Sequence, residues 1–341
     1  MNIHITNIYG MSGTAIKCQH MVADIAKRFF GFNELGIYHY QADLDSEDML
    51  RVRMDGITAS VSYQDFDNII IFQLPTWNGI AFDEALIRHL KAYRKLKMVF
   101  FIHDVTPLMF ESNRYLLKRY IDLYNQADLI ILPSQSMIDF LRTEGLSVSK
   151  IVVQRMWDCK ISIDTMKTPR FRKVFNFAGS VDEDKFSFAK KWQHDVVKLS
   201  VTAEEREWGR NRNIEFLGWF NSQDILADTL RKNGGFGLLW TEDPLCEEYM
   251  KLNACDKLSL YLASGLPVIV HKSIPEAETV IHKNMGFAVD SLEEAVFRVN
   301  NMTEEQYEQM ARKAGLFGNL LREGYFTKKV LLDAVFKLLY A

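Results

Sequence analysis

Residues 256–270, DKLSLYLASGLPVIV, decide the fold. The first half is typical of a short apolar helix, which Gly265 can end in the left-handed conformation and Pro267 prevents from continuing. The β-branched run at 268–270 predicts a buried parallel strand. A helix N-terminus carries free N–H groups and a positive dipole end, and Lys257 adds a charge there, so the segment could hold a phosphate. The alternative is an ordinary αβ unit with a solvated Lys257.

Expected strands and helices alternate along the chain, which predicts an α/β fold with doubly wound parallel sheets. The strands are expected at 2–8, 34–40, 68–74, 97–102, 128–132, 151–153, 174–177, 196–201, 214–217, 236–240, 268–270 and 286–289. The helices are expected at 14–30, 82–95, 114–126, 136–144, 186–192, 222–232, 257–263, 275–282, 292–300, 303–317 and 327–340.

A polar stretch at 158–172 predicts a linker between two Rossmann-like domains, at 1–157 and 173–321. Ligands of doubly wound sheets bind at the carboxyl edge, so we expect the site in a cleft between two such edges. The terminal helix, 327–341, has an apolar face and is expected by analogy to pack back on the first domain. A subunit interface is the competing use of that face.

Composition argues against several classes of protein. The net charge of −3 disfavours binding to nucleic acid by general electrostatic attraction. There is no apolar run of membrane-spanning length and no signal peptide, so we expect a cytoplasmic protein. The four cysteines form no CxxC pair and lack histidines at zinc spacing, which predicts reduced thiols.

Polar residues after strands of the first domain could meet a ligand at the carboxyl edge. Thr14 ends a glycine-containing turn and could cap a helix or bind a ligand, although a plain strand-to-helix turn is favoured. His103 and Asp104 follow a buried strand and could bind a donor sugar and an acceptor hydroxyl. The alternative is a helix-capping Asp beside a His that is bonded to the backbone.

Two further segments follow strands of the second domain. Lys185 could reach a phosphate, but three neighbouring acids compete for its charge and favour a surface lysine. Gly218 and Trp219 could seat a base by backbone contact and stacking, with core packing of the aromatic residue as the alternative.

No convincing metal site is expected. The D-x-D spacings at 43–45 and 65–67 fall in polar loops, and we interpret these carboxylates as solvated. We therefore expect no metal and no other cofactor. Lys257, a second cation and helix N–H groups would neutralise a leaving diphosphate.

The chain resembles the bacterial GT-B glycosyltransferases that extend sugars on serine-rich-repeat adhesins, a family that adds a hexose to GlcNAc on Ser or Thr. The likeness runs nearly end to end, and FIHDVTPLMF and PTWN are uncommon strings. The segments that carry it are ITNIYG (5–10), ELGIYHYQ (34–41), QLPTWNG (73–79), FIHDVTPLMF (101–110), ADLIILPSQSMIDFL (127–141), VSKIVVQRMWD (148–158), GGFGLLW (234–240), KLSLYLASGLPVIV (257–270) and GYFT (324–327).

This resemblance implies a GT-B fold whose first domain faces the acceptor and whose second binds a UDP-sugar. It also implies retention at the anomeric carbon, no metal, and a homo-oligomer in the form of a tetramer. The UDP contacts of the family correspond to Thr14, Lys185, Gly218, Lys257, Leu258, Ser259, Leu260, Tyr261 and Leu262. The family often has Arg at the position of Lys185 and an aromatic residue at that of Gly218. Lysine keeps the charge but not the bidentate grip on phosphate.

The sequence thus predicts transfer of glucose, or GlcNAc, from UDP to a GlcNAc-modified adhesin. Lys257 would hold the diphosphate, and His103 and Asp104 would orient donor sugar and acceptor; no catalytic base is assigned. Two alternatives stay open: a UDP-sugar epimerase of the same fold, and a non-catalytic glycan-binding partner of another glycosyltransferase.

Overall fold

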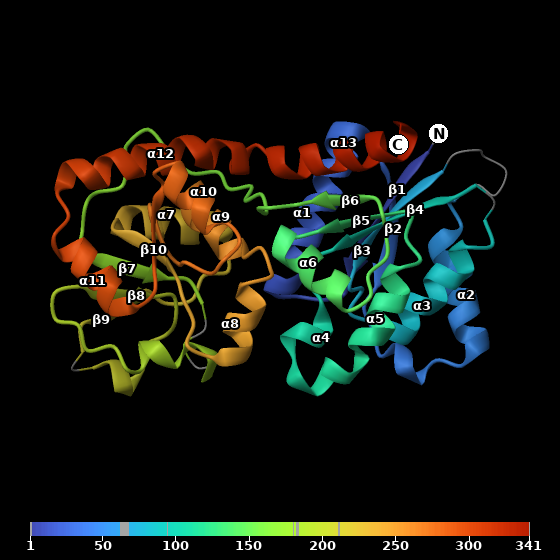
Figure 1. The fold of residues 1–341 in the computed structure, drawn as a ribbon, viewed down its shortest axis with the longest axis horizontal. Coiled ribbons are helices and arrows are strands. Elements are labelled where there is room, and N and C mark those ends of the chain that lie inside the picture. The colour runs from blue at the N-terminus through green and yellow to red at the C-terminus, as the bar shows by residue number, and fades with distance from the viewer. Residues whose placement is uncertain are drawn as a thin grey trace. The chain divides into compact units, whose positions relative to one another are not determined.

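Continuous apolar runs form the strands of two parallel sheets. The computed structural model describes residues 2–61, 68–93, 95–179, 181, 184–210 and 212–340; the side chains of Thr14, Ala15, Asp184 and Lys185 lie outside this description. Within it the chain forms two six-stranded sheets (Figure 1). Unit 1 comprises Met1–Gln154 and Phe326–Ala341, and unit 2 comprises Arg155–Tyr325.

The sheet of unit 1 has the strand order β2-β1-β3-β4-β5-β6, and neighbouring strands pair in parallel. Its central strands are buried and apolar, as expected when helices cover both faces. The strands are β1 Ile3–Tyr9, β2 Asn33–Tyr38, β3 Ile69–Leu74, β4 Lys97–Ile102, β5 Leu129–Leu132 and β6 Ile151–Val153. The helices are α1 Thr14–Phe30, α2 Glu47–Thr58, α3 Ile80–Leu90, α4 Thr106–Met109, α5 Leu117–Tyr124 and α6 Gln135–Thr143.

Helix α13, Tyr325–Tyr340, belongs to unit 1 from Phe326 onward. It buries Val330, Leu331 and Ala334, and the Lys337 ammonium donates to the carbonyl of Ile151 on β6 (2.9 Å). Other apolar residues of this helix, including Leu332 and Phe336, are exposed.

The sheet of unit 2 has the order β12-β11-β10-β7-β8-β9, again all parallel. Together the two sheets confirm the predicted doubly wound α/β fold. The strands are β7 Val174–Phe177, β8 Lys198–Val201, β9 Ile214–Phe216, β10 Phe236–Leu239, β11 Val268–His271 and β12 Gly286–Val289. The helices are α7 Gln223–Asn233, α8 Pro244–Met250, α9 Asp256–Ala263, α10 Ala277–His282, α11 Leu292–Asn300 and α12 Glu304–Arg322.

Some local expectations were wrong. The expected helix at 114–126 begins as a 3₁₀ helix, Glu111–Leu116, and only then becomes α5, while 186–192 overlaps another 3₁₀ helix, Asp184–Ala189. Helices α2, α4 and α8 were not expected, and α4 is only four residues long. Helix α2 buries only Met54 and Thr58, and α8 buries none of its residues, so neither shows a strong apolar stripe.

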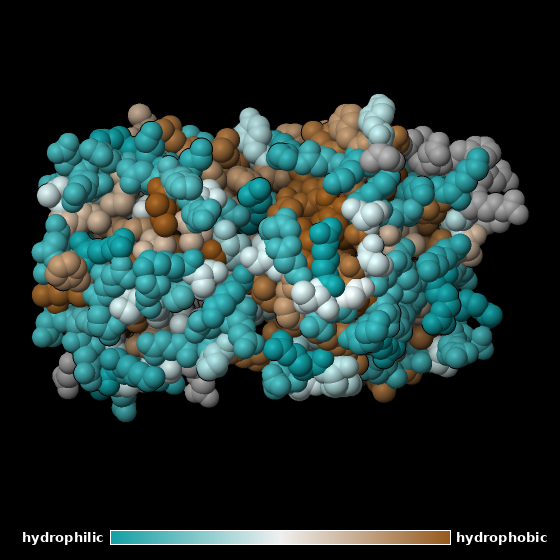
Figure 2. Space-filling model, viewed as in Figure 1, coloured by the Kyte–Doolittle hydropathy of each residue, from teal (hydrophilic) through white to brown (hydrophobic). Residues whose placement is uncertain are grey.

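The outer surface is mostly polar in the view of Figure 2, where hydrophilic side chains cover α2 and α3 of unit 1. Among the helices that the structure describes, none is long and apolar enough to cross a membrane. All four cysteines, Cys18, Cys159, Cys246 and Cys255, are free, as predicted.

Candidate active site

Helix α9 is fixed to the sheet of unit 2 by Tyr261. The Tyr261 hydroxyl accepts a hydrogen bond from the amide of Ala178 (2.7 Å) and donates to the carbonyl of Leu238 (3.2 Å). Gly237 on β10 permits this close approach, since a Cβ built there would lie 2.2 Å from Cγ of Tyr261. The helix is therefore tied to the carboxyl ends of β7 and β10.

The N-terminus of α9 carries a lysine that reaches the end of β7. Cys255 occupies the N-cap position, where its sulfur, a weak acceptor, faces the N–H groups of Lys257 and Leu258 without a capping hydrogen bond. Cε of Lys257 lies 3.5 Å from where a Cβ on Gly179 would stand. The structure thus brings together two segments that the sequence singled out, the start of α9 and the glycine after β7.

Lys257 stays charged in this half-buried position. Burial lowers the pKa of the Lys257 ammonium, but the adjacent Asp256 carboxylate and other neighbours outweigh burial, and the net shift is upward. Within the described part of the chain Lys257 makes no ion pair, so its charge is available to a ligand. A cation beside the weakly capped N–H groups of a helix start suits a phosphate or diphosphate.

The remaining residues of α9 that were predicted to contact UDP are buried. The Tyr261 hydroxyl is already hydrogen-bonded to the backbone of the sheet. The Ser259 hydroxyl is buried with no hydrogen-bond partner among the described residues. The N–H groups beyond the first turn belong to the helix ladder. The buried side chains are those of Leu258, Ser259, Leu260, Tyr261 and Leu262. These contacts remain predictions, and the exposed end of the helix is the part best able to make them.

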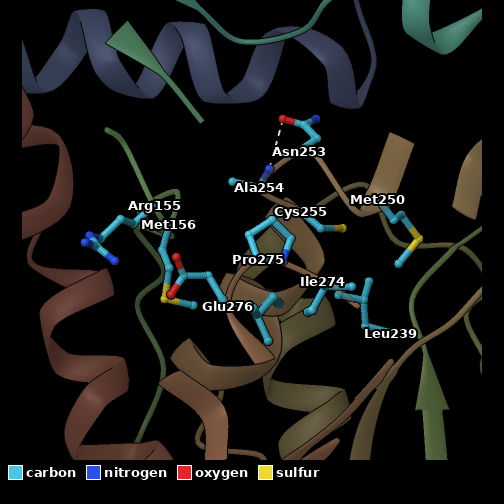
Figure 3. A pocket seen from close by; sticks show the side chains of 11 residues that line it. Arg155, Met156, Leu239, Met250, Asn253, Ala254, Cys255, Ile274, Pro275 and Glu276 are labelled. Carbon is cyan, nitrogen blue, oxygen red and sulfur yellow. Dashed lines mark hydrogen bonds between the residues drawn. The ribbon is translucent and has the colours of Figure 1, made fainter. Parts of the chain in front are cut away.

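A small pocket lies beside the N-terminus of α9 (Figure 3). Its free volume is about 10 Å³, room for about one water, so a larger ligand would extend out of it. In Figure 3, Glu276 lies beside Met156 on one side, and Met250 and Leu239 close the other. Asn253 borders the pocket as well.

Glu276 was missed by the sequence analysis. It is only 7% exposed, yet its carboxylate makes no hydrogen bond or ion pair with any described residue. A carboxylate without an ion pair among the described residues that opens onto a pocket is a candidate functional group. The available signal was its position in the turn after β11, at the same carboxyl edge as α9.

Gly218 lines a second, more open pocket of about 440 Å³ at the carboxyl end of β9. Its φ of 82° is in the left-handed region, and a Cβ there would meet nothing within 4 Å. Trp219 is 66% exposed, and its indole N–H donates to Asn221 (3.1 Å), so the core-packing alternative is wrong for this residue.

Two predicted UDP contacts lie partly outside the described residues. Thr14 is the first residue of α1 and Lys185 lies in the 3₁₀ helix Asp184–Ala189, but neither side chain is described. Their roles remain predictions.

His103 and Asp104 follow β4 in unit 1, and His103 is already engaged. The Gln73 amide donates to two backbone carbonyls, so its oxygen must accept, and His103 Nε2–H donates to it (2.8 Å). Burial lowers the pKa of His103 to about 3, so the imidazole is neutral at pH 7. Asp104 is half-buried at the same edge. Contact of His103 with a sugar therefore requires its other nitrogen or a rotation of the ring.

The D-x-D interpretation needs one correction. Asp45 is not simply solvated, because it forms an ion pair with Arg53 (2.5 Å) and accepts from the Tyr40 hydroxyl (2.6 Å). The 65–67 pair lies outside the described residues. Across the described side chains, no group of three or more His, Cys, Asp or Glu residues is arranged to hold a metal ion.

Comparison with known proteins gives a match along nearly the whole chain. Residues 2–156 match the glucosyltransferase 3-like N-terminal domain, and residues 175–334 match the glucosyltransferase 3-like C-terminal domain. The chain is 44% identical to glucosyltransferase 3 of Streptococcus gordonii over 99% of this chain and 100% of the relative. It is 40% identical to glucosyltransferase 3 of Streptococcus parasanguinis, with 99% of each covered.

A solved structure supports the same fold. The Anabaena protein HepE, crystallised with UDP and glucose, superposes with a TM-score of 0.66 at 14% identity, covering 98% of this chain and 99% of that one. The GT-B fold is thereby confirmed.

Proposed function

Because the chain belongs to the glucosyltransferase 3-like family and is a glycosyltransferase, we propose that it moves glucose from UDP-glucose to GlcNAc on Ser or Thr of a serine-rich-repeat adhesin. UDP-GlcNAc is the second candidate donor. Family membership supports a transferase over the epimerase and the non-catalytic partner that the sequence left open. The observation that carries the proposal is Lys257, a charged lysine without an ion pair among the described residues, at the weakly capped start of α9.

The donor diphosphate binds at the start of α9. The Lys257 ammonium and the first N–H groups of the helix neutralise the charge that grows on the leaving phosphate. Gly179 leaves room beside Lys257, where a side chain would meet both Lys257 and Phe177. Lys185, whose side chain is not described, supplies the second cation. No metal is needed in this proposal.

The uridine extends toward Gly218. The open pocket beside this glycine is large enough for a base or ribose, and Trp219 offers an exposed aromatic face for stacking. The hexose lies toward Glu276, whose unpaired carboxylate accepts hydrogen bonds from sugar hydroxyls. Donor hexoses differ in the arrangement of their hydroxyl groups, so they differ in the hydrogen bonds that they can donate to Glu276. This difference gives the site a means to distinguish donors.

The transfer proceeds with retention at the anomeric carbon. The bond between C1 and the β-phosphate oxygen breaks, and a bond from C1 to the acceptor hydroxyl oxygen forms on the same face. The acceptor proton passes to the leaving phosphate, so UDP is released and no protein nucleophile is required. His103 and Asp104 in unit 1 orient the donor sugar and the acceptor hydroxyl.

We further propose a cytoplasmic homo-oligomer, a tetramer by family resemblance. The free cysteines agree with a reducing compartment. The exposed apolar residues Leu332, Phe336 and Leu339 on α13 support a role for that helix in subunit contact. Light scattering coupled to size-exclusion chromatography tests the subunit number.

The first experiment offers UDP-glucose, UDP-GlcNAc and UDP-galactose to a GlcNAc-serine peptide and measures product mass. It compares the wild type with Lys257→Met, which removes the charge but keeps the length of the side chain. The matched control is Lys198→Met in the same unit, because Lys198 is the first residue of β8, at the edge opposite the carboxyl ends of the strands, and pairs with Glu215 (3.6 Å). Glu276→Gln tests the sugar contact.

We expect a mass gain with UDP-glucose, a loss of about 100-fold in kcat for Lys257→Met, and little change for the control. Unchanged turnover in folded Lys257→Met would defeat the proposed role of the lysine. If no donor modified the peptide although the protein bound UDP, the adhesin-directed transfer would be wrong.

A further inference from the structure

A second cationic pocket lies at the opposite end of α9. It has a volume of about 270 Å³ and is lined by Arg231 of α7, by Arg312, Gly315 and Arg322 of α12, and by Thr168. All of these residues belong to unit 2. Helix α12 crosses α9 closely here, since a Cβ on Gly318 would lie 2.3 Å from the carbonyl oxygen of Leu262 (Figure 1).

Two of these arginines are held in place by the last turn of α9. Arg231, only 8% exposed, donates from Nη1 to the carbonyl of Ser264 (2.9 Å) and from Nη2 to the carbonyl of Lys167. Half-buried Arg322 donates from Nη1 to the carbonyl of Ala263 and from Nη2 to Asn319. These bonds fix both guanidinium groups and use only part of their donors.

The nearby carboxylates act on the two guanidinium groups only without a direct ion pair: Asp164 and Asp228 raise the pKa of Arg231, and Glu323 raises that of Arg322. Among the described side chains neither Arg231 nor Arg322 is in an ion pair, and neither uses Nε–H in a hydrogen bond. Burial lowers the pKa of both groups, and the charge of Arg231 lowers the pKa of Arg322 further. The C-terminal end of α9 carries a partial negative charge of about half a unit, which offsets only part of the two positive charges of Arg231 and Arg322. Arg312, by contrast, pairs with Glu308 (3.4 Å).

We propose that the pocket of Arg231 and Arg322 binds a phosphate-class oxyanion, either free phosphate or the phosphate group of a sugar phosphate. Guanidinium groups with spare, pre-oriented N–H donors match the tetrahedral oxygens of phosphate. Thr168 and Arg312 at the rim supply further donors. The site is distinct from the start of α9 and does not depend on the function proposed there.

Gly315 offers a test that leaves both arginines untouched. A Cβ at this helical position would meet nothing within 4 Å, so a longer side chain can enter the pocket without a clash at its base. Gly315→Glu places a carboxylate beside the arginines. Gly315→Gln has nearly the same size and no charge, and it serves as the matched control.

The full chain is saturated with UDP, so that the donor site is occupied. Its melting temperature is then measured against inorganic phosphate and against sodium chloride at equal ionic strength. We expect phosphate to raise the melting temperature of the wild type and of Gly315→Gln, and the phosphate affinity of Gly315→Glu to fall about tenfold or more. Lys257→Met should keep the wild-type response, which separates this site from the donor site.

Glucose 1-phosphate in place of phosphate distinguishes the two sources: tighter binding identifies a sugar phosphate, and equal binding identifies free phosphate. A wild-type melting temperature that responds to phosphate no more than to chloride would overturn the proposal. Equal phosphate affinities of Gly315→Glu and Gly315→Gln would also overturn it. If the arginines only capped the helix, a negative charge at position 315 would not change the affinity for phosphate.

Discussion

Removal of one oxygen from Tyr261 should affect both stability and donor binding. Its hydroxyl bridges the Ala178 amide and the Leu238 carbonyl inside unit 2, where the tyrosine is fully buried. Tyr261→Phe leaves the Ala178 N–H buried without its acceptor, a cost of about 1–3 kcal/mol. Since Ala178 precedes Gly179, next to Lys257, the loosened backbone should also raise KM for the donor more than it lowers kcat.

Tyr307 provides a matched control in the same unit. It is equally buried, and its hydroxyl donates to the Gly235 carbonyl (2.9 Å), while no backbone N–H of a described residue donates to that hydroxyl. Tyr307→Phe should therefore cost about 0.5–1.5 kcal/mol, the net value of one hydrogen bond. Urea unfolding gives both free-energy changes, and initial rates at varied UDP-glucose give KM. Equal losses of stability, or an unchanged KM in Tyr261→Phe, would refute the bridging role.

Four further substitutions test how packing and buried titratable groups affect stability. Gly318→Ala pushes a methyl group into the α9 backbone and should destabilise the protein by about 1–3 kcal/mol. Gly315→Ala, three residues earlier, meets no obstruction and should stabilise the protein by about 1 kcal/mol. A thermal unfolding measurement that ranks the two variants the other way would contradict this packing. Burial holds the pKa of His103 near 3, below its ordinary 6.5, so stability should fall as the pH drops from 6.5, and His103→Asn should flatten that slope in urea titrations. Burial raises the pKa of Asp83 from 3.8 to about 7, so this group should lower stability as the pH rises through that range, and a slope unchanged in Asp83→Asn would argue against it.

The fold could be predicted because its strands are buried on both faces and appear as uninterrupted apolar runs. Helix α9 was recognised for the same reason, together with Gly265 and Pro267 after it. Helix α8 could not be found in this way, since a helix that buries no side chain has no apolar period to detect. Its Asp243 cap and Pro244 were signals of a helix start that the analysis did not use.

The candidate site was predictable where it depends on a helix terminus, and less so where it depends on tertiary packing. Lys257 was identified from its position in the first turn of an apolar helix. The Tyr261 bridge joins strands that are far apart in the sequence, and only their pairing in the sheet brings Ala178 and Leu238 to one hydroxyl. Glu276 lacked a motif, and its significance lies in lining the pocket without an ion pair among the described residues.

The burial of α9 on nearly every side has a consequence for the engineering of new donor preferences. Six of its eight residues are enclosed by neighbouring chain, so a change of shape at most of its positions would disturb the core before it altered recognition. Libraries aimed at a different sugar nucleotide should leave the helix intact. They should diversify the exposed loops of the same unit instead, beginning with Trp219, which is 66% exposed and can vary at little cost to folding.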